Sequence, residues 1–365
     1  MALRPQPIDG SLAAWGALER EASWGALLIG NGLSINVSER FAYRSLYQTA
    51  TSRGMLSRRD QALFETLGTE NFEVVLGMLD TAIRVSHASE CEVAPLAARY
   101  CSVQSGLGAT VRAAHLPHAQ TPPAALATIK RTMLRHEAVF TTSYDLLAYW
   151  AMGYDQDYGR LADLFWSPSP HGGCAFDGTR ARVWPGWTPL FYLHGALHLV
   201  THADGVTRKL RRTSADAILD QFERPCPDDP LARPLLVSEG TAGEKLREIE
   251  RNAYLRHAID ALRGCQSPLV VFGSALSDQD QHLIDAINEH PERAVAVSMV
   301  RSGGRRERLA LQARIRVRLQ SKQLSFFDAA THPLGGPALR GQQVLGRQVR
   351  AVEPHFRSLS GVARA

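Results

Sequence analysis

The residues AVFTTSYDLLAYW, numbered 138–150, are the clearest indication of the fold class of this chain. Their first part, residues 138–142, is apolar or β-branched and predicts a buried strand, whereas residues 146–150 predict the start of a buried helix. Three polar residues, Ser143, Tyr144 and Asp145, lie between the two. A strand that leads directly into a helix is the repeating unit of an α/β protein.

The same arrangement recurs on both sides of this stretch. Apolar runs that predict strands occupy residues 26–29, 190–195, 234–240, 268–273 and 293–300, with a shorter candidate at residues 324–328. Helical spacing of apolar residues separates several of these runs, and one helix is expected over residues 244–262. We therefore predict an α/β fold, a doubly wound parallel Rossmann-like sheet with an inserted helical subdomain.

The chain is expected to divide into three parts. Residues 1–24 predict an N-terminal helical extension, residues 25–330 the main domain, and residues 331–365 a C-terminal tail. The helical subdomain is expected inside the main domain, at about residues 41–136. Residues 166–189 are polar and rich in proline and glycine, which favours an irregular insertion.

Composition excludes several classes of protein. Of the 365 residues, 45% are hydrophobic and 21% charged, as in soluble globular proteins. No apolar run reaches the roughly 18–20 residues of a membrane helix, and the first residues lack the apolar segment of a signal peptide, so we expect a cytoplasmic protein. Five scattered cysteines without a CxxC pair indicate buried free thiols rather than a disulfide framework or a four-cysteine zinc site.

The net charge of +5 is unevenly distributed. Residues 301–365 hold 13 basic and 3 acidic residues, a net charge of +10, whereas the rest holds 28 basic and 33 acidic residues, a net charge of −5. Six arginines lie between Arg305 and Leu319 among apolar residues. This segment predicts either a solvated helix face that covers the core or a contact with nucleic acid or an acidic partner.

Unusual polar and glycine residues follow several of the predicted strands. In a doubly wound sheet, ligands bind at the carboxyl ends of the strands, so we expect these residues near one site. Each group also has a structural interpretation: a tight turn for the glycines, a helix cap for the Ser and Asp residues, and a core histidine for His194. Gly32 in particular would suit a turn with a positive φ. The groups are Gly30-Asn31-Gly32-Leu33-Ser34, Thr142-Ser143-Tyr144-Asp145, His194-Gly195, and Gly273-Ser274 with Ser277 and Asp278 after it.

The order of these segments resembles the sirtuin superfamily. More narrowly, it resembles bacterial sirtuin-like proteins of an uncharacterised-domain family with "TTNYD", "LHG" and "SEG" segments, over roughly residues 25–330. The resemblance implies a sirtuin-like NAD-binding domain. It implies that the first glycine turn holds the NAD phosphates through Gly30, Asn31, Gly32 and Ser34. Ser143 and Asp145 would lie near the nicotinamide ribose, His194 would be the catalytic histidine, and Gly273 and Ser274 would contact the adenosine side. Thr142, Tyr144 and Asp278 are further residues expected to bind NAD.

Two departures from the sirtuin pattern bear on function. The paired cysteines of the sirtuin zinc ribbon are absent from the sequence, which argues against protein deacylation and predicts a site without metal. Ser143 stands where the related proteins carry Asn, and a serine hydroxyl is about one bond shorter than an asparagine amide. Glu239 and Lys245 are either substrate contacts or an ion pair.

Three hypotheses about function follow. The first is an NAD hydrolase that releases nicotinamide and ADP-ribose in bacterial anti-phage defence, with His194, Ser143 and Asp145 as catalytic residues and NAD as the substrate. The second is a module that binds NAD or ADP-ribose without turnover and serves a defence partner. Either protein would form a homo-oligomer or a complex with a translocase ATPase or an Argonaute-like protein, through residues 41–136 or the basic C-terminal end. The third is a nucleic-acid contact through the basic C-terminal region, which we rank last because aromatic residues do not accompany the arginines.

Overall fold

A seven-stranded sheet, in which all pairs are parallel, forms the centre of the computed structural model. The structure describes residues 9–156, 160–168, 174–202, 204–210, 233–237, 242–301 and 304–340. In spatial order the strands are β12 (Gln323–Asp328), β11 (Ala294–Met299), β10 (Leu269–Phe272), β1 (Ala26–Ile29), β2 (Ala138–Thr141), β6 (Thr188–Tyr192) and β3 (Leu161–Ala162). The predicted doubly wound α/β fold is confirmed.

Strand β1 lies at the point where the chain changes direction across the sheet. From β1 the chain passes to β2 on one side, and it later returns to place β10 on the other. Ala26 pairs with Ala138 of β2 and with Leu269 of β10, so the three strands end at the same level. Such a switch point leaves a crevice at the carboxyl ends of the strands, because the loops after β1 and its neighbours diverge.

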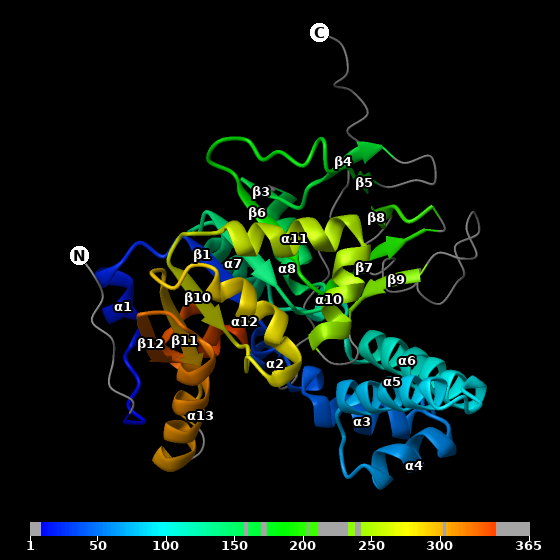
Figure 1. Ribbon diagram of the computed structural model, residues 1–365. Coiled ribbons are helices and arrows are strands. Elements are labelled where there is room, and N and C mark those ends of the chain that lie inside the picture. The colour runs from blue at the N-terminus through cyan, green and yellow to red at the C-terminus, as the bar shows by residue number, and fades with distance from the viewer. Residues whose placement is uncertain are drawn as a thin grey trace, which may run out of the picture.

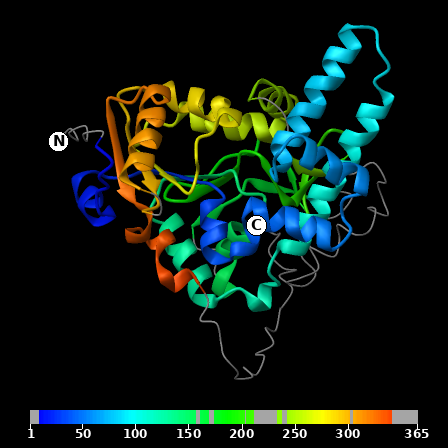
Figure 2. The same ribbon diagram turned by 90° about the horizontal axis from the view of Figure 1, so that it is seen from below.

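Helices cover both faces of the sheet, which explains why the central strands are apolar throughout (Figures 1 and 2). One face carries α10 (Ala242–Arg251), α11 (Ala253–Gly264) and α12 (Gln281–Asn288), with α13 (Arg305–Arg318) towards β12. The other face carries α2 (Gly32–Val37), α7 (Pro123–Met133) and α8 (Leu147–Met152). The single helix expected over residues 244–262 is two helices, because Asn252 accepts hydrogen bonds from the amides of Tyr254 and Leu255 and starts α11.

The predicted helical region consists of two parts. Helices α3 (Tyr43–Ser52), α4 (Arg58–Thr66), α5 (Phe72–Ala88) and α6 (Ala94–Ala114) pack on one another beside the sheet, whereas α7 packs on α8 (Figure 1). A buried carboxylate joins α4 to α6: Asp60 accepts hydrogen bonds from Arg99 and Ser102, each at 2.8 Å. Helices α5 and α6 form a long hairpin that projects from the body of the molecule (Figure 2).

A second, antiparallel sheet was not predicted. It contains, in order, β4 (Phe165–Pro168), β5 (Cys174–Phe176), β8 (Thr207–Lys209), β7 (Gly195–Thr201) and β9 (Arg233–Leu236). The irregular insertion expected at residues 166–189 therefore contributes strands, and the expected strand at residues 234–240 pairs antiparallel with β7 instead of joining the parallel sheet. The sequence could not distinguish these cases, because a buried apolar run has the same pattern in either kind of sheet.

The two ends of the described chain meet at the edge of the large sheet. Ala13 forms a bridge with Phe327 of β12, and Trp15 of α1 (Trp15–Glu21) packs on Phe327 and His332 with ring centroids 5.0 and 4.7 Å apart. Within the described ranges, no helix is long and apolar enough to cross a membrane. Cys91 and Cys101 are exposed and Cys174 and Cys265 half-buried, so the expectation of buried thiols is wrong for these four, and Cys226 lies outside the described residues.

Candidate functional site

A cavity of about 420 Å³ opens at the carboxyl ends of β1, β2 and β10, at the switch point of the sheet. Its lining draws on the turn after each of these strands, on the residues after β6, and on the helical region. Most of the residues predicted from the sequence line it: Gly30, Asn31, Gly32, Thr142, Ser143, Tyr144, Asp145, His194, Gly273 and Ser274. Ser34 and Asp278 are the two predicted residues outside this lining.

Gly30 and Gly32 allow two loops of the site to touch. A Cβ atom on Gly30 would lie 2.6 Å from the carbonyl oxygen of Gly273, and one on Gly32 would lie 2.5 Å from the Gly273 Cα. The Gly32 amide also donates to the Gly273 carbonyl at 2.8 Å. The expected positive φ is found at Gly273, at +69°, and not at Gly32, which begins α2 with an ordinary helical backbone. The glycines of the first turn are therefore required by contact between the loops.

Three buried polar side chains form a network at the end of β2. The Ser34 hydroxyl donates to Oδ2 of Asp145, and the Oγ atoms of Ser34 and Ser143 lie 3.3 Å apart. Oδ1 of Asp145 accepts the amide of Leu147 at 2.8 Å, at the first residue of α8. The N-cap residue of α8 is Leu146, without a side-chain cap, so Asp145 is not the N-cap that the sequence suggested, but it lines the cavity. Ser34 lies behind it and acts on the cavity through Asp145 and Ser143.

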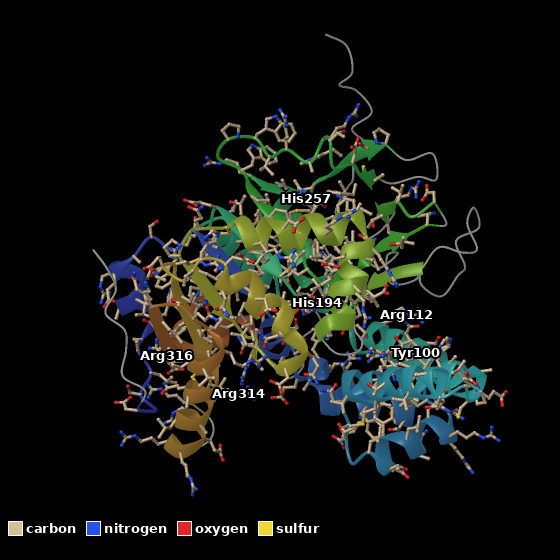
Figure 3. All side chains as sticks on the ribbon, in the orientation of Figure 1. Tyr100, Arg112, His194, His257, Arg314 and Arg316 are labelled. Atoms are coloured by element: carbon tan, nitrogen blue, oxygen red, sulfur yellow. The ribbon has the colours of Figure 1, made fainter. Side chains whose placement is uncertain are left out.

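His194 follows β6 and reaches the cavity next to the β2 turn. The Leu193 amide donates to the Thr141 carbonyl at 2.9 Å, and the His194 carbonyl accepts the Val237 amide at 2.8 Å, so both sheets hold this segment. Nε2 of His194 lies 2.8 Å from Nε2 of His282 in α12. Figure 3 places His194 in the interior, near α10 and α12.

Burial makes this histidine pair hard to protonate. Burial, with the nearby positive charge of Lys245 and the His282 ring, lowers the pKa of His194 well below its ordinary value. Burial and Lys245 lower the pKa of His282 from 6.5 to about 4. Lys245, in α10, is itself only 1% exposed. Glu239, with which the sequence predicted either an ion pair or a shared role in substrate contact, lies outside the described residues.

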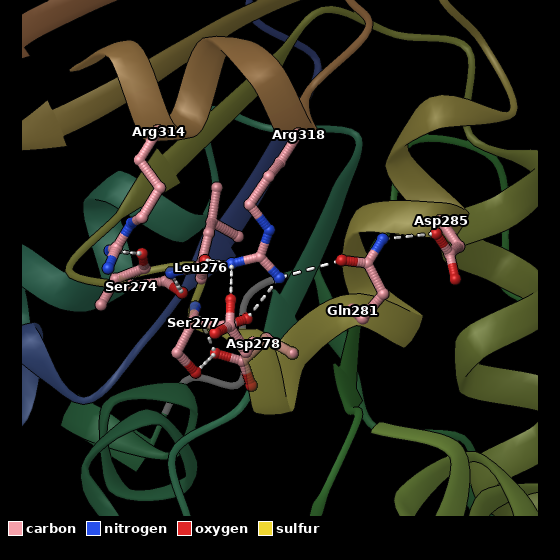
Figure 4. Close-up of polar contacts among 10 residues, drawn as sticks. Ser274, Leu276, Ser277, Asp278, Gln281, Asp285, Arg314 and Arg318 are labelled. Carbon is pink, nitrogen blue, oxygen red and sulfur yellow. Dashed lines mark hydrogen bonds and ion pairs between the residues drawn. The ribbon is translucent and has the colours of Figure 1, made fainter. Parts of the chain in front are cut away.

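The turn after β10 is held by two arginines of α13 (Figure 4). Arg318 donates to the carbonyls of Leu276 and Ser277 at 2.6 and 2.8 Å, and Arg314 donates to the Ala275 carbonyl at 3.3 Å. Leu276 is buried with a φ of +45°, a conformation that L residues rarely adopt. These contacts hold the backbone of Ser274 to Ser277, which forms one wall of the cavity.

Asp278, which we expected to bind NAD, lies outside the cavity lining. Its side chain is 95% exposed and pairs with Arg318 at 3.0 Å. Ser277 is the cap that the sequence suggested, and its partner in the capping box is Asp280. Gln279 and Asp280, the next two residues of the short 3₁₀ turn η4 (Asp278–Asp280), line the cavity instead.

The apolar wall of the cavity was not predicted. Phe41 and Leu46 come from the segment after α2, Phe72 from α5, and Leu107 and Val111 from α6. Helical spacing identified such residues as buried, but the pattern cannot distinguish a side chain that faces a cavity from one that faces the core. Among the residues that the structure describes, no group of three or more His, Cys, Asp or Glu side chains could hold a metal ion.

The chain matches one protein family and is distantly similar to solved structures. No curated protein matches it. A solved structure described as "Structural Basis for the Mechanism and Regulation of Sir2 Enzymes" is 12% identical and has a TM-score of 0.37, with 88% of this chain and 94% of that one covered. One described as "Sir2-p53 peptide-NAD+" is 13% identical, covers 78% of this chain and 84% of its own, and has a TM-score of 0.29. Similarity at TM-scores this low does not transfer a function. The family described as a domain of unknown function, DUF4917, matches residues 27–334, and the chain belongs to that family.

Proposed function

We propose that this protein is an NAD hydrolase, which cleaves the bond between nicotinamide and ribose and releases nicotinamide and ADP-ribose. The observation that carries the proposal is the convergence of predicted residues on one cavity at the switch point. Separate strand ends supply Asp145, Ser143 and His194 to it, and the turn after β10 supplies Ser274. This is the place where doubly wound folds bind nucleotides.

The hydrolysis requires mainly that the protein position NAD and water and stabilise the positive charge that develops on the ribose. The C1′–N bond breaks with its electron pair on nicotinamide, which is a good leaving group because its ring nitrogen is positively charged in NAD. The ribose then carries positive charge, and water adds to C1′ and loses a proton. A carboxylate at the cavity wall, such as Asp145, would stabilise that charge. Ser143 would orient the water, and the apolar wall would exclude bulk solvent.

Among the residues that the structure describes, His194 has one ring nitrogen left for a substrate. Its Nε2 is engaged by His282, so Nδ1 is available to the cavity that the ring lines. With its pKa lowered by burial, the ring is neutral at pH 7 and can either hold a ribose hydroxyl or accept the proton of the water.

The test is nicotinamide release from NAD, followed by chromatography, with the purified full-length protein and its Ser143→Asn variant. We expect release by the parent or, if the serine has weakened the site, by the variant. His194→Ala should reduce turnover by a factor of about 100–10,000 while NAD binding changes by less than about tenfold. A His194→Ala protein with a lower melting temperature but full turnover would show that His194 is only a core residue.

Ser143 favours a second candidate, a module that binds NAD or ADP-ribose without cleaving it. Its hydroxyl is 3.3 Å from Ser34 and is held within the polar network, so it extends less far into the cavity than an asparagine amide would. A lost polar contact of about 1–3 kcal/mol slows a reaction by one to two orders of magnitude. Calorimetry that detects NAD or ADP-ribose binding, without nicotinamide release by either protein, would support this candidate.

We also propose a role in bacterial anti-phage defence, as a homo-oligomer or with a translocase ATPase or an Argonaute-like partner. The support is the sequence resemblance and the projecting α5–α6 hairpin, on which Met78 and Val85 are 48% and 60% exposed. Light scattering of the full chain should show an oligomer that Val85→Glu weakens. A monomer that does not co-purify with a neighbour-encoded protein would contradict this part of the proposal.

A further inference from the structure

His194 and His282 form a buried pair at the back of the cavity. His194 follows β6 and is 3% exposed, and His282 lies in the first turn of α12 and is 2% exposed. Their Nε2 atoms are 2.8 Å apart, which is a hydrogen-bond distance, and their ring centroids are 5.0 Å apart. His194 lines the cavity, whereas His282 does not.

The hydrogen bond requires the two rings to be different tautomers. Both rings are neutral near pH 7, because burial and Lys245 lower both pKa values. A bond between two neutral Nε2 atoms needs one N–H and one lone pair. In a neutral ring only one of the two nitrogens carries a proton. The ring that donates from Nε2 therefore has a bare Nδ1, and the ring that accepts at Nε2 has a protonated Nδ1, so the tautomer of His282 determines that of His194.

The surroundings of His282 favour one of the two arrangements. Its Nδ1 is buried and has no hydrogen-bond partner within the part of the chain that the structure describes. A buried N–H without a partner is rarer in proteins than an under-satisfied acceptor. The favoured arrangement therefore leaves Nδ1 of His282 unprotonated and places the N–H of this ring on Nε2.

We infer that His282 is a positioning residue, whose Nε2–H donates to His194 and holds it in the tautomer with its N–H on Nδ1. His194 then presents a hydrogen-bond donor to the cavity. Such a donor binds an oxygen acceptor, and in the reaction proposed above, on which this step rests, that acceptor is a ribose hydroxyl oxygen. His194 does not start as the base that takes the proton of the water.

The tautomers can be measured without any activity. Long-range ¹H–¹⁵N spectra of the full-length protein labelled with ¹⁵N-histidine distinguish protonated from bare ring nitrogens, and His194→Gln and His282→Gln assign the two rings. We expect a protonated Nδ1 and a bare Nε2 for His194, and the reverse for His282. A His194 ring protonated on Nε2, or an even mixture of both forms, would overturn the inference.

Variants at position 282 test the consequence for turnover. His282→Leu removes the donor, so His194 should show a tautomer mixture and kcat should fall about 10- to 100-fold, with KM within a factor of about three. His282→Gln retains an N–H donor and should recover most of that loss, which a role in packing alone would not explain. His290→Leu, two residues after the end of α12 and outside the cavity lining, is the control for folding.

The outcomes separate this inference from the proposed function. If no variant hydrolyses NAD but the spectra show the expected tautomers, the inference stands and the hydrolase proposal fails. If the parent hydrolyses NAD and His282→Leu retains full kcat with an unchanged His194 spectrum, the inference fails and the hydrolase proposal stands.

Discussion

At the scale of single residues, the site depends on the Asp145 carboxylate, whose hydrogen-bond donors among the described residues are uncharged. Asp145 is buried and accepts one hydrogen bond from the Ser34 hydroxyl and one from the Leu147 amide. A buried charge that loses one of its donors is destabilised, because water cannot replace the bond.

Ser34→Ala should therefore lower the free energy of unfolding by about 1–3 kcal/mol. Urea unfolding followed by tryptophan fluorescence measures the change. Ser52→Ala, at an exposed position of α3, is the control and should change stability by less than about 0.5 kcal/mol. Equal stability of the Ser34→Ala and Ser52→Ala proteins would show that the Ser34–Asp145 bond is unimportant.

Gly32 and Gly108 provide a matched test of the contact between the loops after β1 and β10. A methyl group on Gly32 would meet the Gly273 backbone at 2.5 Å, whereas one on Gly108, in α6, has no heavy atom within 4 Å. Gly32→Ala should destabilise the protein by at least about 1 kcal/mol, because neither backbone can move freely. Gly108→Ala should stabilise it by about 0.5–1 kcal/mol through helix propensity. Thermal unfolding of both variants tests this, and a stabilised Gly32→Ala protein would contradict the contact.

At the scale of elements, α13 supports the site from the opposite side of the β10 turn. Four of its arginines donate to main-chain carbonyls: Arg305 to Asp9, Arg308 to Gly10, Arg314 to Ala275 and Arg318 to Leu276 and Ser277. Much of the positive charge of α13 is therefore used to bind backbone carbonyls of the same chain. The unfavourable backbone of Leu276 persists only where its surroundings hold it, and Arg318 holds it by donating to the carbonyls of Leu276 and Ser277.

Arg318→Met should release this turn. We expect faster amide exchange at residues 274–277 and, for the NAD binding proposed above, an affinity at least tenfold weaker, because the turn forms one wall of the cavity. Arg306→Met removes the same charge from an exposed position of the same helix and should change neither quantity. If amide exchange at the turn is the same in both variants, Arg318 does not hold it.

The sequence predicted individual strands more accurately than it predicted which strands pair with one another. Strand–turn–helix patterns located β1, β2 and β10, since each strand is a continuous apolar run followed by glycine or polar turn residues. The antiparallel sheet was missed because β5 and β8 are only three residues long and β9 has the apolar pattern of a parallel strand. His282 was missed because a buried histidine on an amphipathic helix has no sequence signal until its partner, 88 residues earlier, is placed beside it.

At the scale of the whole molecule, several buried histidines make stability depend on pH. Burial lowers the pKa of His282 from 6.5 to about 4 and that of His332 to about 3. In the unfolded chain, these imidazoles take up protons near pH 6.5, whereas in the folded protein they stay neutral until about pH 4 and 3. Between these limits the unfolded state binds more protons, so stability is full above pH 6.5 and falls as the pH drops.

His332 allows this effect to be isolated, because it lies outside the cavity lining and stacks on Phe272 with ring centroids 5.0 Å apart. His332→Phe keeps an aromatic ring but cannot be protonated. It also loses the acceptor for the Leu334 amide, which should lower stability by a similar amount at every pH. Between pH 7.5 and 5, the parent should lose about 2 kcal/mol more unfolding free energy than the variant, as expected for one histidine held neutral below its ordinary pKa. Urea unfolding of both proteins at the two pH values measures the difference. Equal losses would mean that His332 has the same pKa in the folded protein as in the unfolded chain.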